Sequence, residues 1–174
     1  MEVRMVLLTV IRVAVVLCVA GYALVLDANS VLAQEKKLTV IGRVEKVWIR
    51  DAKVVLRAKI DTGAHTTSLG VENIETFKRG NRDWVRFSFL NGAGASVTLE
   101  RRLVQFKPLK KTNVPGTEIR PVILLKLCVA DIYRLTQVNL ARRSKLNYPI
   151  LIGRRFLFAK AVVNVAQQYT SEPH

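Results

Sequence analysis

Apolar and polar side chains alternate along much of the chain after residue 37, with the period of two that is typical of half-buried β-strands. In an expected strand over 84–90, Val85, Phe87 and Phe89 share one face, and the residues between them share the other. Similar apolar runs predict strands over 38–49, 53–60, 96–106, 119–129 and 132–140, and shorter strands at 150–152 and 161–165.

Turn signals separate these runs. Asn91-Gly92 is a hairpin signal between the strands over 84–90 and 96–106. Residues 107–116 contain two prolines, an asparagine and a glycine, so we expect a loop there. Residues 154–160 favour one or two helical turns, and no long amphipathic helix is expected after residue 33. Many short strands predict an all-β fold, either a small barrel or a sandwich.

The first 33 residues have the pattern of a secretory signal peptide. Arg4 and Arg12 form a basic start, residues 13–26 are uncharged and apolar, and residues 31–33 have small or modest side chains before a cleavage point after Ala33. The alternative is an uncleaved membrane anchor. A membrane span needs about 20 apolar residues, and Arg12 interrupts any longer run. We therefore expect export and a periplasmic location.

The length of 174 residues predicts one folded domain. We expect a linker at 34–39, a barrel at 40–167 and a polar tail at 168–174. The net charge of +15 survives cleavage, because residues 1–33 hold two acidic and two basic side chains. Such a charge attracts polyanions, so an anionic envelope surface is a candidate partner. The basic residues are scattered in pairs without interleaved aromatics, so we do not expect nucleic acid.

The composition argues against a zinc site and against a Ser-His-Asp triad. The chain has only two histidines, His65 and His174, and it contains neither a His-Glu-x-x-His nor a Cys-x-x-Cys motif. A catalytic zinc site usually takes three protein ligands, and no nucleophile-elbow sequence accompanies His65. We therefore expect no metal and no cofactor. Cys128 is the one cysteine left after cleavage, and we expect it to be buried.

The best candidate for chemistry is Asp61, which ends an apolar and basic run and precedes Thr62-Gly63-Ala64. Small residues let the backbone turn tightly and leave space beside the carboxylate. The triplet alone is a weak signal, because an aspartate before glycine often only forms a turn. Two further segments strengthen it: Leu151-Ile152-Gly153 begins 90 residues after Asp61, and a glycine-containing hairpin at 91–95 lies between them.

Together these segments resemble the retropepsin-like aspartic proteases, which combine an Asp-Thr-Gly-Ala loop, a flap hairpin and an Ile-Ile-Gly-Arg-type segment. The chain is most similar to a bacterial branch labelled ATP-dependent zinc protease and associated with RimK/LysX-type ATP-grasp ligases. The resemblance covers about residues 40–170, and its blocks are 41–45, 58–69, 84–87, 118–122 and 148–154. His65 and Asn164 depart from the family pattern, as do the residues after Ser68. Neither zinc ligands nor a phosphate-binding glycine loop supports the label.

The resemblance implies an all-β fold: a small closed acid-protease barrel with one short helix near the C-terminus. It implies that Asp61 is the catalytic residue. The residues that it assigns to the active-site loop are Thr62, Gly63, Ala64, His65 and Thr66. Those assigned to the support behind the loop are Ile152, Gly153 and Arg154, with Arg154 in an ion pair. Those assigned to the flap are Asn91, Gly92, Ala93 and Gly94, with residues 78–82 as the alternative.

The resemblance also implies an aspartic endopeptidase that acts on a peptide or polypeptide. Two carboxylates about 3 Å apart share one proton, so that one acts as base and the other as acid. The chain has a single Asp-Thr-Gly, so the pair requires a homodimer in which Asp61 faces its symmetry mate. The alternative is a non-catalytic basic binding or accessory module of the cell envelope with the same fold. The peptidase hypothesis requires Asp61 to pair with a second carboxylate, whereas the binding-module hypothesis does not.

Overall fold

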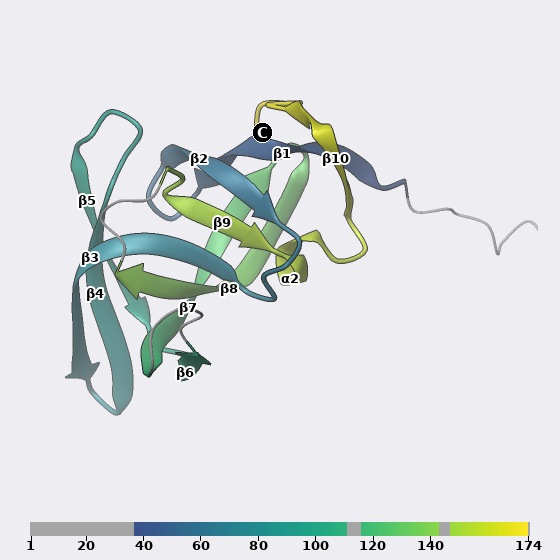
Figure 1. Ribbon diagram of the computed structural model, residues 1–174. Coiled ribbons are helices and arrows are strands. Elements are labelled where there is room, and N and C mark those ends of the chain that lie inside the picture. The colour runs from purple at the N-terminus through teal and green to yellow at the C-terminus, as the bar shows by residue number, and fades with distance from the viewer. Residues whose placement is uncertain (1–36, 111–115, 143–146, 174) are drawn as a thin grey trace, which may run out of the picture. The chain divides into compact units, whose positions relative to one another are not determined.

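The computed structural model describes residues 37–110, 116–142 and 147–173, which form ten strands and one short helix (Figure 1). The strands are β1 (Thr39–Ile49), β2 (Val54–Asp61), β3 (Thr67–Arg79), β4 (Arg82–Leu90), β5 (Ser96–Arg102), β6 (Gln105–Lys110), β7 (Thr117–Val129), β8 (Ile132–Arg142), β9 (Ile150–Gly153) and β10 (Ala161–Gln168). The helix is α2 (Arg154–Leu157). The predicted signal peptide lies outside the described residues. No helix in the described part is long and apolar enough to cross a membrane.

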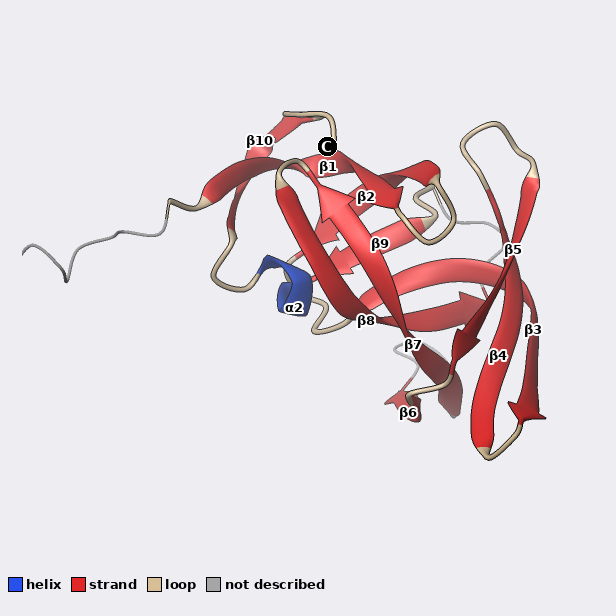
Figure 2. Ribbon diagram, turned by 180° about the vertical axis from the view of Figure 1, so that it is seen from behind, coloured by secondary structure: helices blue, strands red, loops and turns tan. Residues whose placement is uncertain are grey.

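A closed ring of strands forms the barrel. β1 pairs with β2, β2 with β9, β9 with β3, β3 with β8 and β8 with β7. The pairing of β7 with β1 completes the ring, and closure leaves these strands without a free edge. Helix α2, blue in Figure 2, lies beside β8 and β9. The predicted closed barrel with one short helix near the C-terminus is therefore confirmed.

The remaining strands lie outside the ring. β10 runs parallel to β1, and β6 pairs with β7. β4 and β5 continue the outer half of β3 as a twisted sheet (Figure 1). This sheet contributes to the core as predicted, because Val85, Phe87 and Phe89 are all buried. Ser88 lies between them in the alternation but is also buried, and its hydroxyl accepts a hydrogen bond from Asn73 Nδ2 at 3.0 Å.

The core follows from the alternation along each strand. In β7, Ile123, Leu125 and Leu127 are fully buried, whereas Leu124 and Lys126 between them are exposed. Side chains of this kind from all the ring strands fill the interior, together with Phe156 from α2. Cys128 is buried as expected. Burial of apolar area is the main stabilising contribution in such an interior.

Two strands differ from the sequence-based predictions. No strand was predicted over residues 67–79, because the second half of β3 is largely polar and exposed. The loop predicted for 107–116 is wrong at its start, since Gln105–Lys110 forms β6. Pro108 is tolerated there because β6 is an edge strand that pairs only with β7 in the described part, and an edge position needs no amide donor. Consequently the expected strand over 96–106 is divided after Arg102.

The C-terminal tail is attached to the barrel. β10 extends to Gln168, beyond the expected end at 165. The Tyr169 amide then donates to the Val44 carbonyl at 2.8 Å. The amide and hydroxyl of Thr170 donate to the carboxylate of Glu45, which is fully buried. These bonds satisfy a charged group that would otherwise be costly to bury.

Candidate active site

Asp61 is the last residue of β2, where the chain leaves the barrel wall and enters a tight turn. Across the parallel β2–β9 pair it lies opposite Gly153. The side chain of Asp61 is half-buried, and Thr62 and Gly63 beside it are exposed. The strand pairing therefore brings the two motifs that are 90 residues apart in sequence into direct contact.

The turn itself orients the Asp61 carboxylate. Its Oδ1 accepts hydrogen bonds from the amides of Gly63 at 3.1 Å and Ala64 at 3.2 Å. A Cβ added at Gly63 would lie 3.3 Å from Oδ1, which is tighter than an ordinary contact. Among the described residues, no hydrogen bond reaches the second oxygen, Oδ2. One carboxylate oxygen is thus fixed by the backbone, and the other is left for a further partner.

Arg154 holds the loop from behind. Its Nη1 donates to the carbonyl oxygens of Thr62 at 2.8 Å and Gly63 at 3.0 Å. The Arg154 amide donates to the Ala64 carbonyl at 2.8 Å, and the Arg155 amide donates to the His65 carbonyl at 3.0 Å. The expected ion pair of Arg154 is therefore wrong for the described residues. The guanidinium binds backbone carbonyls because the loop presents them at its rear.

The segment before Arg154 packs tightly against the same loop. Ile152 is fully buried. The Gly153 amide donates to Thr67 Oγ1 at 3.2 Å. A Cβ at Gly153 would lie only 2.7 Å from the carbonyl carbon of Thr66 and 3.0 Å from the Ala64 carbonyl oxygen. Position 153 therefore requires glycine because a larger side chain would clash with the loop. The backbone conformation is not the reason, since any residue can adopt its φ of −87°.

Sequence reasoning missed a polar network that reaches the loop from the β6–β7 hairpin. Lys107 Nζ donates to Thr66 Oγ1 at 3.2 Å. Arg120 donates to Asn139 Oδ1 at 3.3 Å, and Asn139 Nδ2 donates to the Thr67 carbonyl at 3.0 Å. Arg120 lies in one of the sequence blocks of the family resemblance, whereas Lys107 had no signal because a loop was predicted there.

The two predicted flap segments lie at other hairpin tips. The turn at 91–95 is closed by a bond from the Asn91 amide to the Ala95 carbonyl at 2.8 Å. Gly92 in this turn faces the Val55 carbonyl near the start of β2, whereas Asp61 is at its end. The alternative, residues 78–82, includes the β3–β4 turn. In the described part no hydrogen bond joins either segment to residues 61–66, and the flap assignment stays a prediction.

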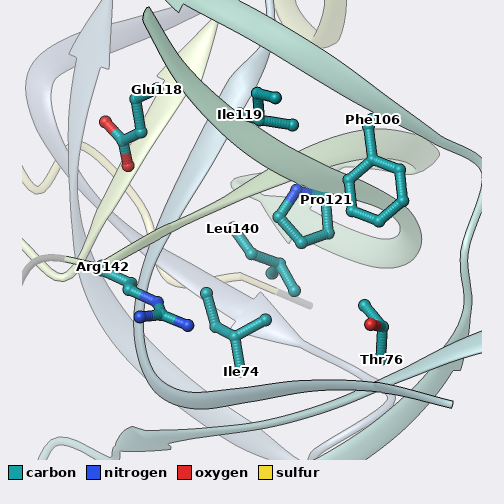
Figure 3. A pocket seen from close by; sticks show the side chains of 8 residues that line it. All are labelled: Ile74, Thr76, Phe106, Glu118, Ile119, Pro121, Leu140 and Arg142. Atoms are coloured by element: carbon teal, nitrogen blue, oxygen red, sulfur yellow. The ribbon is translucent and has the colours of Figure 1, made fainter.

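A cavity of about 370 Å³ lies between β3, β6, β7 and β8 (Figure 3). Its lining residues are Ile74, Thr76, Phe106, Glu118, Ile119, Pro121, Leu140 and Arg142. Asp61 is not among them, so this cavity is separate from the candidate catalytic loop. Within the described ranges, no group of three or more His, Cys, Asp or Glu side chains is arranged to hold a metal ion.

Comparisons with known proteins identify the family of this chain. Residues 40–174 match the family described as RimB-like, retropepsin-like aspartic endopeptidase RimB. A probable alpha-L-glutamate ligase of Shewanella pealeana is 26% identical over 117 residues, which cover 66% of this chain and 25% of the relative. One of Desulfotalea psychrophila is 28% identical over 115 residues, covering 65% and 25%. The matched part of this chain thus spans about a quarter of these relatives' length.

One solved structure is similar over its whole length. It is the Lpg0085 protein of unknown function (DUF785) from Legionella pneumophila subsp. pneumophila str. Philadelphia 1. It is 30% identical to this chain and superposes with a TM-score of 0.67, covering 78% of this chain and 100% of the other.

Proposed function

Because this chain belongs to the RimB-like family of retropepsin-like aspartic endopeptidases, we propose that it is an exported peptidase that acts as a homodimer. Its catalytic group is a pair of Asp61 carboxylates, one from each chain. The observation that supports this best is the setting of Asp61, whose Oδ1 is held by two backbone amides in a loop braced from behind by Arg154.

The chemistry of the pair follows from electrostatics. Two carboxylates brought within about 3 Å share a single proton, because both cannot be ionised at that distance. The ionised Asp61 takes a proton from the attacking water, and the protonated Asp61 donates to the carbonyl oxygen of the scissile bond. Exposed Thr62 and Gly63 leave the loop open to a second copy, and their small size permits close approach.

The hydrogen bonds of the loop contribute positioning. Catalysis by a fixed carboxylate depends on geometry, and a displacement of about 1 Å can cost about a hundredfold in rate. Arg154, the Arg154 amide and the Arg155 amide together engage four loop carbonyls, from Thr62 to His65. These bonds fix the position of the loop in the absence of a substrate, and a general base depends on such positioning.

We do not propose a ligase activity for this chain on the basis of its curated relatives' names. Those proteins are called probable alpha-L-glutamate ligases, but the match covers only a quarter of their length. The chain also carries no glycine-rich loop for phosphate, so we propose peptide hydrolysis without ligation.

The decisive experiment compares peptide cleavage by the wild-type protein and by Asp61→Asn. Asparagine is nearly isosteric and still offers an oxygen to the Gly63 and Ala64 amides, so the fold should persist. The amide can neither share the proton nor activate water, so activity should be abolished. Asp131→Asn is the matched control, because Asp131 is an exposed aspartate outside the loop. Wild-type activity should fall on dilution and show a bell-shaped pH profile.

Sedimentation and intact mass, measured on the same preparations, test the dimer and the export. Protein recovered from the cell envelope should begin at Gln34, and an intact Met1 would contradict cleavage. Activity retained by a folded Asp61→Asn protein would exclude the aspartic mechanism. Inactivity of both proteins on broad peptide libraries would favour the alternative, a non-catalytic envelope-binding module, which the net charge of +15 supports.

A further inference from the structure

The sheet formed by β3, β4 and β5 has one face on the core and the other in solvent. Val85 and Phe87 of β4 are fully buried on the inner face, whereas Trp84 is only half-buried. Directly opposed residues of an antiparallel pair place their side chains on the same face. Trp84 is opposite Phe77 of β3 and Arg102 of β5. The outer face therefore carries an aromatic pair with an arginine beside it.

Two further arginines complete this surface at the β3–β4 turn. Arg79 and Arg82 oppose each other in the register position next to the aromatic pair. The guanidinium carbon of Arg79 lies 4.5 Å from the centroid of the Trp84 ring and 5.4 Å from that of Phe77. Arg79, Arg82 and Trp84 also line an open hollow beside the turn. We call Phe77, Arg79, Arg82, Trp84 and Arg102 together the hairpin-tip patch.

The positive charge of the hairpin-tip patch exceeds the negative charge that reaches it. Arg79 forms an ion pair with Glu100. Arg82 and Arg102 are exposed, and neither forms an ion pair within the described ranges. Arg82 also stands opposite Arg79, and like charges in that arrangement are destabilising. Two guanidiniums beside an aromatic pair are therefore available to an anion from outside the chain.

The combination of aromatic rings and available guanidiniums indicates the class of partner. Tryptophan is favoured at membrane–water interfaces, where its ring lies at the level of the lipid head groups. A guanidinium binds phosphate oxygens through paired hydrogen bonds. A free phosphate ion would use the arginines alone, whereas a lipid surface would use the arginines and the rings. The net charge of +15 adds a long-range attraction to an anionic membrane.

We propose that the hairpin-tip patch binds the surface of an anionic lipid membrane. Lipid phosphates accept hydrogen bonds from Arg82 and Arg102, and the Trp84 ring packs among the head groups. β4 and β5 lie outside the barrel ring that contains β2, the strand of Asp61 (Figure 2). The inference goes beyond the proposed function, and it holds equally for a peptidase and for a non-catalytic module.

Trp84 fluorescence tests this docking directly. The protein used begins at Gln34, because the apolar residues 13–26 would themselves bind lipid, and the ring and its core are formed from Thr39 onward. Trp48→Phe leaves Trp84 as the single tryptophan. Its emission should shift to the blue on vesicles of equimolar phosphatidylcholine and phosphatidylglycerol, and brominated lipid should quench it. Vesicles of phosphatidylcholine alone should cause neither change, and Trp48 in Trp84→Phe protein should show no shift.

Sedimentation with the same vesicles measures the contribution of the two arginines. The double variant Arg82→Gln/Arg102→Gln should bind roughly twentyfold to thirtyfold more weakly, since each basic residue near an anionic membrane contributes about fivefold in affinity. Arg43→Gln/Arg57→Gln is the matched control. It removes the same charge from exposed arginines of β1 and β2 that form no ion pair in the described part, and it should bind nearly as tightly as the wild type. Added salt should weaken the binding of all three proteins.

Four results would overturn the proposal. The first is a lack of binding of the wild type to the anionic vesicles. The second is an equal loss in both double variants, which would mean that net charge alone attracts the membrane. The third is an unshifted Trp84 emission on vesicles that do bind the protein. The fourth is release from the vesicles by inorganic phosphate at constant ionic strength, or equally tight binding of single-stranded DNA, which would assign the patch to a free anion or to a nucleic acid.

Discussion

Replacing Gly153 with alanine should force the Asp61 loop away from the end of β9. The backbone at Gly153 has φ −87° and ψ 168°, which alanine adopts without strain. The cost is therefore purely steric. The new Cβ would lie 2.7 Å from the Thr66 carbonyl carbon, 2.9 Å from the Thr67 nitrogen and 3.0 Å from the Ala64 carbonyl oxygen.

The magnitude follows from what these neighbours can do. Carbon atoms pack best at about 3.5–4.0 Å, so the closest pair must separate by roughly 0.8 Å or more. All three neighbours are backbone atoms, and hydrogen bonds to Gly153, Arg154 and Arg155 hold their loop. Overpacking of this kind costs about 1–3 kcal/mol in the free energy of unfolding. Because no side chain can rotate away, we expect a value in the upper half of that range.

Urea and thermal unfolding measure the loss of stability, and peptide cleavage measures the effect of the displaced loop on activity. The loss of stability should lower Tm by roughly 2–8 °C for each kcal/mol. A loop displaced by about 1 Å should reduce kcat/KM by about a hundredfold. Gly92→Ala is the control for the stability measurement alone, because its Cβ would meet the Val55 carbonyl oxygen at an ordinary 3.4 Å. A Gly153→Ala protein within about 0.5 kcal/mol of the wild type, with full activity, would refute the reasoning.

Two other predictions concern buried and charged contacts. Thr170→Ala should lower the free energy of unfolding by about 1–3 kcal/mol, measured by urea unfolding, because it removes the hydroxyl donor from the fully buried Glu45 carboxylate. Hydrogen bonds from Arg79 and Arg86 lower the pKa of Glu100 below its ordinary value of 4.5. Its contribution to stability is therefore present above the unfolded pKa and is lost as the pH falls through the folded pKa, so Glu100→Gln should flatten stability-versus-pH curves below about pH 4.5.

Each of the two substitutions, Thr170→Ala and Glu100→Gln, has a matched control variant. Thr98→Ala removes an exposed threonine hydroxyl on β5, and a loss as large as that of Thr170→Ala would remove the special role of Glu45. Glu72→Gln removes an exposed carboxylate that forms no ion pair within the described ranges. The acid limb of its stability curve should match that of the wild type, whereas an unchanged limb in Glu100→Gln would contradict the assigned pKa direction.

The strands with strict alternation could be predicted from the sequence because their burial is decided locally. In β4 and β7 the apolar residues at every second position identify the inner face without knowledge of the partner strands. β3 was missed because only its first half faces the core, and β6 was missed because Pro108 signals a loop unless an edge position is known. Whether a strand lies at the edge or in the centre depends on the whole sheet, and the local sequence pattern does not reveal it.

The same division applies to the site. The sequence by itself indicated the Asp61 turn, since a small-residue loop after an apolar strand permits a tight turn. The family resemblance added the expectation that a second apolar segment, ending in Gly153, supports that loop. Only the tertiary structure decided that Arg154 binds loop carbonyls, and that Lys107 and Arg120 stand opposite each other beside Thr66 and Thr67. Those contacts join residues from 13 to 92 positions apart, and the register of the paired strands places them with a precision that sequence spacing cannot supply.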